Sequence, residues 1–331
     1  MDTNATIIVL IFAVIFDYLI ADPWGWLHPV QVMGWLISRY SQFTLSTCQG
    51  KRQRRLAGVI LGLGLIIGSG MAGWSLHLIT DHLHPWLGIF LEIVLLASCF
   101  AGRSLRLASL DVLTPLREGN IDLARSKLAQ YVGRDTANLS PEEIWRATLE
   151  TVSENAIDGV TSPLFYAIAG AFFPGVGPVA LALAYKAAST LDSMVGYQQE
   201  PFTDLGWFSA KFEDILTWIP CRLTVLTLAI LSGKPILVLS ICRRDAPQDP
   251  SPNSGWSECI YAAILGVQLG GKNTYQGVIK EKPLLGDPLN PITPQSIQKA
   301  LNLTRICCLL WLGSGITCLL YTSPSPRDRE K

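Results

Sequence analysis

Residues 56–79 read LAGVILGLGLIIGSGMAGWSLHLI, and this stretch decides the class of fold. It is longer than the ~20 apolar residues that a helix needs to cross the core of a bilayer, and it contains no Asp, Glu, Lys or Arg. Its many glycines would allow neighbouring helices to approach closely. We therefore predict that residues 56–79 form a membrane-spanning helix.

The composition of the whole chain agrees with a membrane protein. Of the 331 residues, 16% are charged and 49% are hydrophobic, whereas charged residues make up about 25% of a typical soluble chain. The formal net charge is zero, and no basic run is interleaved with aromatic residues, which argues against nucleic acid as a partner. The eight cysteines have no CxxC pair or neighbouring histidine at metal-ligand spacing, so we interpret them as small buried side chains.

Other apolar segments are candidates for further spans. Residues 6–21, 86–101 and 303–321 are each long enough or nearly so, and residues 215–242 are apolar but broken by Pro220 and by Gly233-Lys234-Pro235. The first segment lacks the basic start and the cleavage site of a signal peptide, so we expect it to be retained. The run KRQRR at 51–55 precedes the second span, and the positive-inside rule places it in the cytoplasm.

The segment from about 103 to 159 has a different pattern. Its apolar residues recur every three or four positions between polar ones, and Gly119 and Gly133 are typical helix stops. The sequence Ser140-Pro141-Glu142 is typical of a helix start, with a capping serine, a proline at the first position and acidic residues in the first turn. We predict a water-facing helical insertion on the cytoplasmic side.

Residues 160–189 are apolar but interrupted by PGVGP at 174–178. Each half has roughly thirteen residues, which is too short to cross a bilayer alone. A broken or re-entrant hairpin would return both polar flanks to one side of the membrane, and this is the interpretation we favour over a single kinked span. The fold class that we predict is thus all-α, a multi-pass integral membrane protein with a polar helical insertion and a broken or re-entrant hairpin.

The remaining polar segments complete the predicted organisation. Residues 243–302 are rich in Pro, Gly and Asn, and we predict a polar loop region with one short helix. The sequences GKP at 233–235 and LGGKNTYQG at 269–277 lack the GxxxxGK[ST] pattern of a phosphate loop. The predicted divisions are 1–102, 103–159, 160–242, 243–302, 303–321 and a tail at 322–331 that we expect to be unstructured and whose native origin is left open.

A polar stripe interrupts the apolar pattern between the insertion and the hairpin. Arg146, Glu150 and Glu154 are spaced four residues apart, so they share one face of a helix, and Asn155 and Asp158 follow within the next turn. Such groups are costly to bury beside a membrane unless they are paired or used. A functional site and a solvated helix face with i,i+4 ion pairs are both consistent with this pattern.

Other polar side chains lie at the edges of apolar segments. Lys186 is near Asp192 in sequence and Lys211 is near Asp214, and either lysine would also be explained by snorkelling towards lipid headgroups. His28 lies between a leucine and a proline after the first apolar segment, where a turn residue is the simpler interpretation.

Five motifs together resemble the cobinamide-phosphate synthase family (CobD/CbiB type) of cobalamin biosynthesis. They are DYLIADPWGWLHPVQVMGWLI at 17–37, GRDTANLSPEEIWRATLETVSENAIDGVTSPLFY at 133–166, YKAASTLDSMVGY at 185–197, AKFEDILTWIPCRL at 210–223 and SPNSGWSECIYAAILGVQLGG at 251–271. The resemblance extends from about residue 16 to 286. The chain departs from the family pattern at Ala188-Ser189-Thr190, where Asn is usual before the Thr-Leu-Asp-Ser-Met run, and at Cys221, where Ala is common.

The resemblance implies an enzyme of the cell inner membrane with its active site on the cytoplasmic side. It implies the substrates adenosylcobyric acid and aminopropanol or its phosphate, joined through an amide bond, with ATP and Mg²⁺ taking part. Membrane lipid is an implied partner, and a homo-oligomer is left open. The rival interpretations are a corrinoid-binding membrane component or transporter without catalysis, and a structural partner in a biosynthetic complex.

The resemblance and the residue types together suggest site residues. The expected catalytic residues are Glu154, Asn155, Asp158, Lys186, Asp192 and Ser193, and the expected metal ligands are Glu154, Asp158 and Asp192. The expected substrate-binding residues are Arg134, Asp135, Arg146, Glu150, Tyr197, Lys211, Asp214, Arg222, Asn253 and His28. Trp207, Tyr197 and Trp256 are expected either to contact the corrinoid or to lie in an interfacial aromatic belt.

Overall fold

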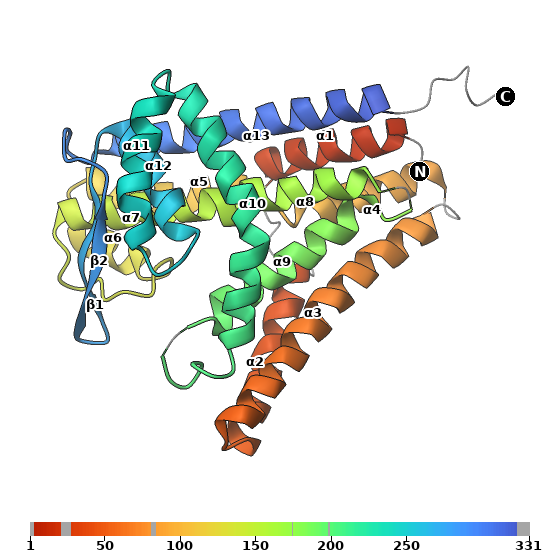
Figure 1. Cartoon of the computed structure of the whole chain (residues 1–331), viewed down its shortest axis with the longest axis horizontal. Coiled ribbons are helices and arrows are strands. Elements are labelled where there is room, and N and C mark those ends of the chain that lie inside the picture. The colour runs from red at the N-terminus through yellow and green to blue at the C-terminus, as the bar shows by residue number, and fades with distance from the viewer. Residues whose placement is uncertain (1–2, 21–27, 81–83, 174, 198, 323–331) are drawn as a thin grey trace. The chain divides into compact units, whose positions relative to one another are not determined.

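The computed structural model describes residues 3–20, 28–80, 84–173, 175–197 and 199–322 (Figure 1). The chain divides into two compact units. Unit 1 contains residues 1–101, 162–216 and 308–331, and unit 2 contains residues 102–161 and 217–307. The predicted turn at 21–27 and the predicted tail at 323–331 lie outside the described residues.

Unit 1 is built from helices. They are α1 (Thr3–Ile20), α2 (Pro29–Thr47), α3 (Lys51–Thr80), α4 (Pro85–Ala97), α8 (Ser162–Ala171) and α9 (Gly177–Val195). Two long helices, α10 (Trp207–Leu231) and α13 (Pro294–Thr322), contribute residues to both units. Unit 2 contains α5 (Gly102–Arg117), α6 (Ile121–Leu128), α7 (Pro141–Ala156), the π-helical turn η1 (Ile157–Thr161), α11 (Pro235–Asp245), the 3₁₀ turn η2 (Ala246–Gln248), α12 (Ser254–Leu265) and the strands β1 (Leu269–Tyr275) and β2 (Val278–Leu285).

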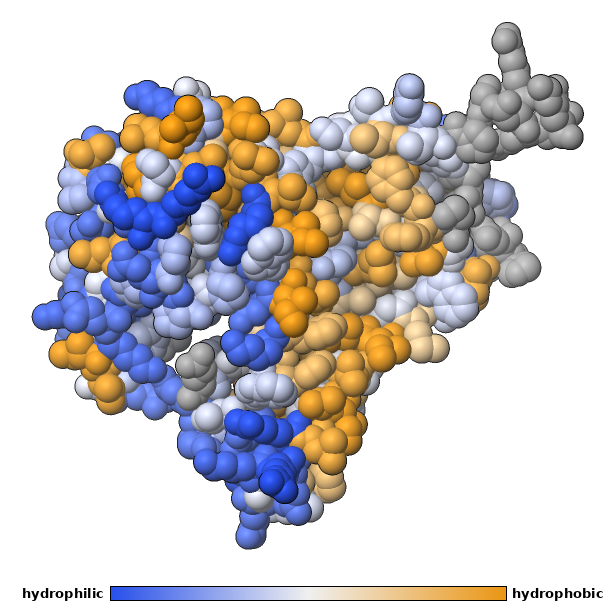
Figure 2. All heavy atoms as spheres, in the orientation of Figure 1, coloured by the Kyte–Doolittle hydropathy of each residue, from blue (hydrophilic) through white to orange (hydrophobic). Residues whose placement is uncertain are grey.

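The prediction of an all-α multi-pass membrane protein is confirmed. Among the described residues, five helical stretches are long and apolar enough to cross a membrane: Thr3–Ile20, Lys51–Ile79, Pro85–Arg117, Trp207–Leu231 and Pro294–Thr322. Their outward surfaces are apolar, as a lipid-facing surface must be. Figure 2 shows this on α3, where a hydrophilic end gives way to a hydrophobic surface. The exposed apolar side chains of this helix include Ile60 and Ile67.

The glycines of α3 allow the close helix packing that the sequence predicts. A Cβ atom at Gly58 would clash with the Leu205 carbonyl, and one at Gly73 would lie 2.9 Å from the Ala180 Cα. Gly73 therefore lets the backbone of α9 come close to α3.

Helix α2 was not predicted, because polar residues interrupt its apolar pattern. It begins at Pro29, with His28 as its N-terminal cap.

The apolar segment after residue 160 forms the predicted hairpin. Helices α8 and α9 pack against each other, and Tyr166 stacks on Tyr185 with ring centroids 5.0 Å apart. At the turn between them, Gly170 lies so close to Gly177 that a Cβ atom would clash with its carbonyl oxygen. Antiparallel packing of this kind excludes a single kinked helix through residues 162–195.

The expected break at Pro220 is wrong, since α10 continues through it. A proline inside a helix removes the N–H that would bond to the carbonyl four residues earlier. That carbonyl belongs to Leu216, and the Tyr166 hydroxyl donates a hydrogen bond of 2.9 Å to it. The side chain replaces the missing donor, which removes one of the two reasons for the helix to end. The break at Gly233 is real, because α10 ends at Leu231 and Gly233 has a φ of +70°.

The region 243–302 is more ordered than the loop that the sequence suggests. The predicted short helix is α12, and the antiparallel hairpin β1–β2 was not predicted. Strand β1 contains two glycines, a lysine and an asparagine, so it lacks the alternation of apolar and polar residues that indicates a strand. The hairpin packs beside α12 in unit 2 (Figure 1).

The segment predicted as a water-facing helical insertion is helical, and its position outside the membrane stays a prediction. It contains α5, α6 and α7, whose buried side chains Val112, Leu116, Leu128 and Ile144 form an apolar core within unit 2. Ser140 accepts a hydrogen bond from the Glu143 N–H, and the Glu143 carboxylate accepts one from the Ser140 N–H. This capping box is the helix start that the sequence predicts.

Candidate active site

The centre of the candidate site is the polar stripe of α7. Arg146 and Glu150 lie on one face of this helix, and Arg146 Nη1 is 3.4 Å from Glu150 Oε1. The side chain of Glu150 is only 2% exposed, whereas Glu154 is exposed one turn further on. The stripe therefore runs from a buried carboxylate to a solvent-facing one along a single helix face.

Three donors satisfy the carboxylate of Glu150. Arg134 Nη2 lies 2.5 Å from Glu150 Oε2, and the Gly270 N–H donates a hydrogen bond of 2.9 Å to Glu150 Oε1. Arg146 is the third donor. Burial lowers the pKa of Arg134, but the charge and the hydrogen bond of Glu150 outweigh this and raise it, so the guanidinium remains protonated. The buried Glu150 thus holds two cations from different segments.

The hairpin β1–β2 supplies the other partners of the two arginines. Arg134 Nη1 donates to Asn273 Oδ1 at 2.8 Å, and Arg146 Nη2 donates to the same oxygen at 3.2 Å. Arg146 also donates to the backbone carbonyls of Gly270 and Lys272. These bonds attach α7 and the loop before it to β1, more than a hundred residues away in sequence.

Asp135 attaches the same loop to the tip of the hairpin. Its carboxylate accepts hydrogen bonds from the Gln276 N–H at 3.1 Å and the Gly277 N–H at 2.8 Å. Its own backbone N–H donates to the Thr274 carbonyl at 2.8 Å. Asp135 is therefore a turn-capping residue, and its expected contact with substrate stays a prediction.

A second buried carboxylate lies on α12. Glu258 Oε1 accepts a hydrogen bond of 3.0 Å from Lys282 Nζ of β2, and the side chain of Glu258 is fully buried. Burial raises the pKa of Glu258 to about 8, with a smaller contribution from the charges of Glu150 and Glu154, while the ammonium of Lys282 opposes the shift. Neither Glu258 nor Lys282 was among the site residues expected from the sequence.

The stripe ends in an irregular turn. The π-helical turn η1 follows α7 directly and contains Asp158, which is half-buried. Its last residue, Thr161, accepts a hydrogen bond of 2.8 Å from the Thr224 hydroxyl. Wide turns of this kind often occur at functional sites. Asn155 is exposed just before the turn and donates to the Thr151 carbonyl of its own helix at 2.9 Å.

Arg222 and Asn253 form a separate cluster in unit 2. The guanidinium of Arg222 lies over the rings of Trp218 and Trp256, at 5.2 and 4.7 Å from their centroids. It also donates to Asn253 Oδ1 at 3.3 Å and to the Pro252 carbonyl at 2.8 Å. Trp256 therefore packs against a cation of its own chain, and its expected contact with a corrinoid stays a prediction.

The other expected site residues belong to unit 1. Lys186 and Asp192 are half-buried on α9, and the exposed Ser193 donates to the Ser189 carbonyl at 2.8 Å. Lys211 Nζ is 3.7 Å from Asp214 Oδ2 one turn along α10. Three further members lie in unit 1 with partners of their own: Tyr197 packs near Phe202, His28 Nδ1 accepts from the Val30 N–H, and Trp207 lies 5.5 Å from the guanidinium of Arg55.

The expected metal ligands are divided between the units. Glu154 and Asp158 belong to unit 2, and Asp192 belongs to unit 1. In the described part of the chain, no three His, Cys, Asp or Glu side chains form a group suited to a metal ion. Magnesium is often held by only one or two carboxylates together with substrate phosphates. Glu154 is exposed and Asp158 is half-buried on the next turn, so carboxylates of that type are present in unit 2, and their binding of magnesium stays a prediction.

These features define a class of protein. It is a multi-pass helical membrane protein in which α7, the loop before it and a β-hairpin join in a buried network of arginine, lysine and glutamate. The CobD/CbiB protein family model matches residues 10–304, so the chain belongs to this family.

Curated relatives match the chain over nearly its whole length. A cobalamin biosynthesis protein CobD from Synechocystis sp. is 55% identical over 314 residues, which cover 95% of this chain and 92% of the relative. A cobalamin biosynthesis protein CbiB from Salmonella arizonae is 38% identical over 322 residues, 96% of each chain. A CobD from Citrobacter koseri is 38% identical over 320 residues, again 96% of each chain. A comparison with solved structures found no match.

Proposed function

We propose that this protein is an adenosylcobinamide-phosphate synthase of cobalamin biosynthesis. It would join adenosylcobyric acid to aminopropanol or aminopropanol phosphate by an amide bond. The observation that carries the proposal is the family match over residues 10–304. The network around Glu150, Glu154 and Glu258 supports it, because it gathers carboxylates and cations of the types that the reaction needs.

The chemistry explains why those types are needed. A carboxylate is a poor electrophile, so we propose that one of its oxygens first attacks the terminal phosphorus of ATP, which releases ADP and leaves an acyl phosphate. The amine nitrogen then attacks the acyl carbon, phosphate departs, and the nitrogen loses a proton to a base. Magnesium, when bound, would neutralise charge on the phosphates.

The residue roles follow from the groups that are accessible. Glu154 is exposed one turn after the buried Glu150 and would bind magnesium or orient the amine, and the same roles are proposed for Asp158 and, in unit 1, for Asp192. Asn155 and Ser193 would position the carboxylate of the substrate. Arg134, Arg146 and Lys186 would bind phosphate, although the two arginines also hold the hairpin through Glu150 and Asn273.

We further propose that the protein resides in the inner membrane with its active site facing the cytoplasm. The basic residues of the first turn of α3, at 51–55, favour a cytoplasmic position under the positive-inside rule. The phosphate donor ATP is also a cytoplasmic substrate. Accessibility of a cysteine introduced at the exposed Lys272 to a membrane-impermeant reagent, in intact cells and in inverted vesicles, would test this orientation.

The function is tested by an assay on membranes that contain the protein. Adenosylcobyric acid, aminopropanol phosphate and Mg-ATP are supplied, each is omitted in turn, and cobinamide phosphate is followed by mass. We expect product only when all three are present, and loss of product in Asp158→Ala and Asp192→Ala but not in the exposed control Glu281→Gln. Corrinoid binding without product from the wild-type protein would favour the binding or transport interpretation instead.

A further inference from the structure

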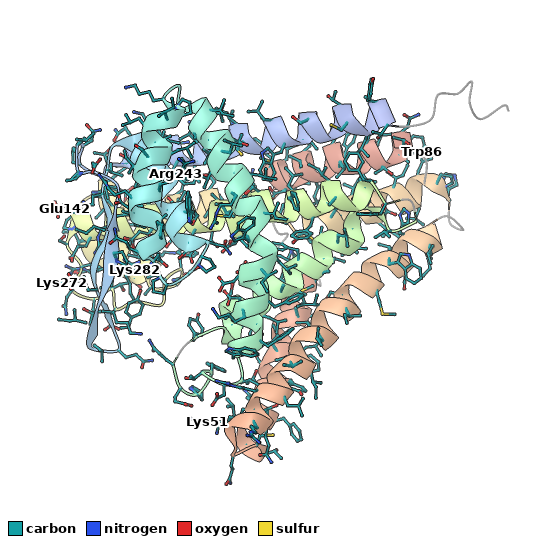
Figure 3. All side chains as sticks on the ribbon, viewed as in Figure 1. Lys51, Trp86, Glu142, Arg243, Lys272 and Lys282 are labelled. Carbon is teal, nitrogen blue, oxygen red and sulfur yellow. The ribbon has the colours of Figure 1, made fainter. Side chains whose placement is uncertain are left out.

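The ion pair between Lys282 and Glu258 has an unusual distribution of exposure. Lys282 Nζ lies 3.0 Å from Glu258 Oε1, yet the side chain of the lysine is 29% exposed and that of the glutamate is fully buried. The second oxygen, Glu258 Oε2, is buried and has no hydrogen-bond partner among the described residues. The carboxyl group of Glu258 on α12 is thus enclosed, whereas part of the Lys282 side chain on β2, labelled in Figure 3, is open to solvent.

This pair is not needed to hold the hairpin in place. The hairpin is already attached by Arg134 and Arg146 through Asn273, by Asp135 at its tip, and by Asp245, which accepts from the Gly286 N–H at 2.9 Å. A buried ion pair with an unsatisfied oxygen is generally no more stable than well-packed apolar residues of similar volume. Its presence therefore points to a role other than stability.

The surroundings of Lys282 indicate what that role is. Burial lowers the pKa of Lys282, but the charges of Glu258, Glu154 and Glu150 together raise it, so the ammonium is protonated at neutral pH. The charge of Glu154, the exposed carboxylate of the α7 stripe, is one of the causes of that rise. A partly exposed ammonium that a buried carboxyl group holds in place is suited to donate charge-assisted hydrogen bonds to the oxygens of a phosphate group.

We propose that Lys282 binds a phosphate group of a substrate and that Glu258 is the positioning residue that holds its ammonium. The proposal rests on the proposed function and adds two residues to the site. The phosphate belongs either to the amine substrate or to the nucleotide, since both present the same chemistry to a lysine.

The test measures binding, without turnover, to the purified full chain in detergent. Two ligand pairs are compared: aminopropanol phosphate with aminopropanol, and Mg-ATP with adenosine. We expect Lys282→Met to weaken one phosphorylated ligand by about tenfold to a hundredfold, as for the loss of a charge-assisted hydrogen bond, and to leave its unphosphorylated partner unchanged. Whichever pair responds identifies the source of the phosphate.

Further variants separate binding from packing. Lys282→Arg should retain most of the affinity, and Glu258→Gln should weaken the same ligand less than Lys282→Met does. Lys272→Met is the matched control, because Lys272 is an exposed lysine on the other strand (Figure 3). If Lys282→Met does not fold, the double variant Lys282→Met/Glu258→Gln, which also replaces the buried carboxyl group left without its lysine, is used for the same measurement.

The proposal is overturned if both members of each pair weaken equally, if no phosphorylated ligand responds, or if Lys272→Met has the same effect. Turnover by the wild-type protein is measured in parallel. Product formation with phosphate binding that is independent of Lys282 would reject this inference and keep the proposed function. Phosphate binding that requires Lys282, without product from any substrate combination, would keep this inference and reject the proposed function.

Discussion

The two buried carboxylates of unit 2 differ in how well they are satisfied. Glu150 accepts hydrogen bonds from two arginines and from a backbone N–H, so both of its oxygens have partners. Glu258 has Lys282 on one oxygen and no partner for the other among the described residues. The comparison teaches that the first carboxylate holds the fold together, whereas the second has hydrogen-bonding capacity that the fold does not use.

The same contrast appears in the cations. Arg134 is 7% exposed and Arg146 is 15% exposed, and their hydrogen bonds go to the protein itself. Lys282 is more exposed than either and has a single partner in the network. A ligand can therefore reach Lys282 with less rearrangement of the hairpin than it would need to reach the arginines.

Removing Glu150 should have the largest effect on stability. Glu150→Ala leaves Arg134 and Arg146 without their shared counter-ion and the Gly270 N–H without an acceptor. Breaking a buried ion pair from one side costs about 3–5 kcal/mol, and we expect a loss of that size in the free energy of unfolding, measured by chemical denaturation in detergent. The exposed control Glu281→Ala should change it by less than about 0.5 kcal/mol. A similar small loss for Glu150→Ala would remove the distinction between the two carboxylates.

A substitution at Gly270 should come next, because this glycine holds the bulge that faces Glu150. Its φ is +85°, and a Cβ atom there would clash with the Pro283 carbonyl. Gly277 at the hairpin tip has a φ of +78° but open space around it. We expect Gly277→Ala to cost about 1–2 kcal/mol from backbone strain alone, and Gly270→Ala to cost more than that by the same denaturation measurement. Equal losses would mean that the bulge relaxes freely and that Glu150 does not fix it.

The pH dependence of the unfolding free energy should reveal the contribution of Glu258. The pKa of Glu258 is raised from an ordinary value of 4.5 to about 8, so between these values the folded state binds more protons than the unfolded state. Stability from this group is therefore fully present below pH 4.5 and is lost as the pH rises through about 8, by at most about 1.4 kcal/mol per pH unit. Glu258→Gln should flatten the unfolding free energy between pH 5 and 8. If the unfolding free energy of the variant depends on pH as steeply as that of the wild-type protein, the titrating group is not Glu258.

Local sequence patterns predicted one half of this network. The four-residue spacing of Arg146, Glu150 and Glu154 identified the face of α7, and the Ser140 cap fixed where the helix begins. These signals lie within one helix, where the chain itself determines which side chains are neighbours. The same holds for the apolar spans, whose length and composition reflect the bilayer directly.

The other half of the network could not be predicted in this way. Glu150 meets Gly270 across 120 positions of sequence, and no periodicity in GGKNTY indicates a strand. The sequence predicted a polar loop in this segment, but Gly270 is needed because the buried Glu150 carboxylate and the Pro283 carbonyl approach its backbone. Glu258 and Lys282 were missed for a related reason. Each is an isolated charge in its own segment, and only the structure shows that the two side chains are in contact.

The smallest effect on stability is expected at two predicted catalytic residues outside the buried network. Asn155 and Ser193 are exposed, and each donates a hydrogen bond only to a carbonyl four residues earlier in its own helix. Asn155→Ala and Ser193→Ala should therefore change the unfolding free energy by less than about 0.5 kcal/mol. If these side chains position the substrate carboxylate as proposed, both variants should nevertheless lower kcat/KM in the amide-forming assay by about tenfold or more. The exposed Thr317, which donates to the Gly313 carbonyl four residues earlier in its own helix, provides the control Thr317→Ala. Full activity in both site variants would remove Asn155 and Ser193 from the proposed site.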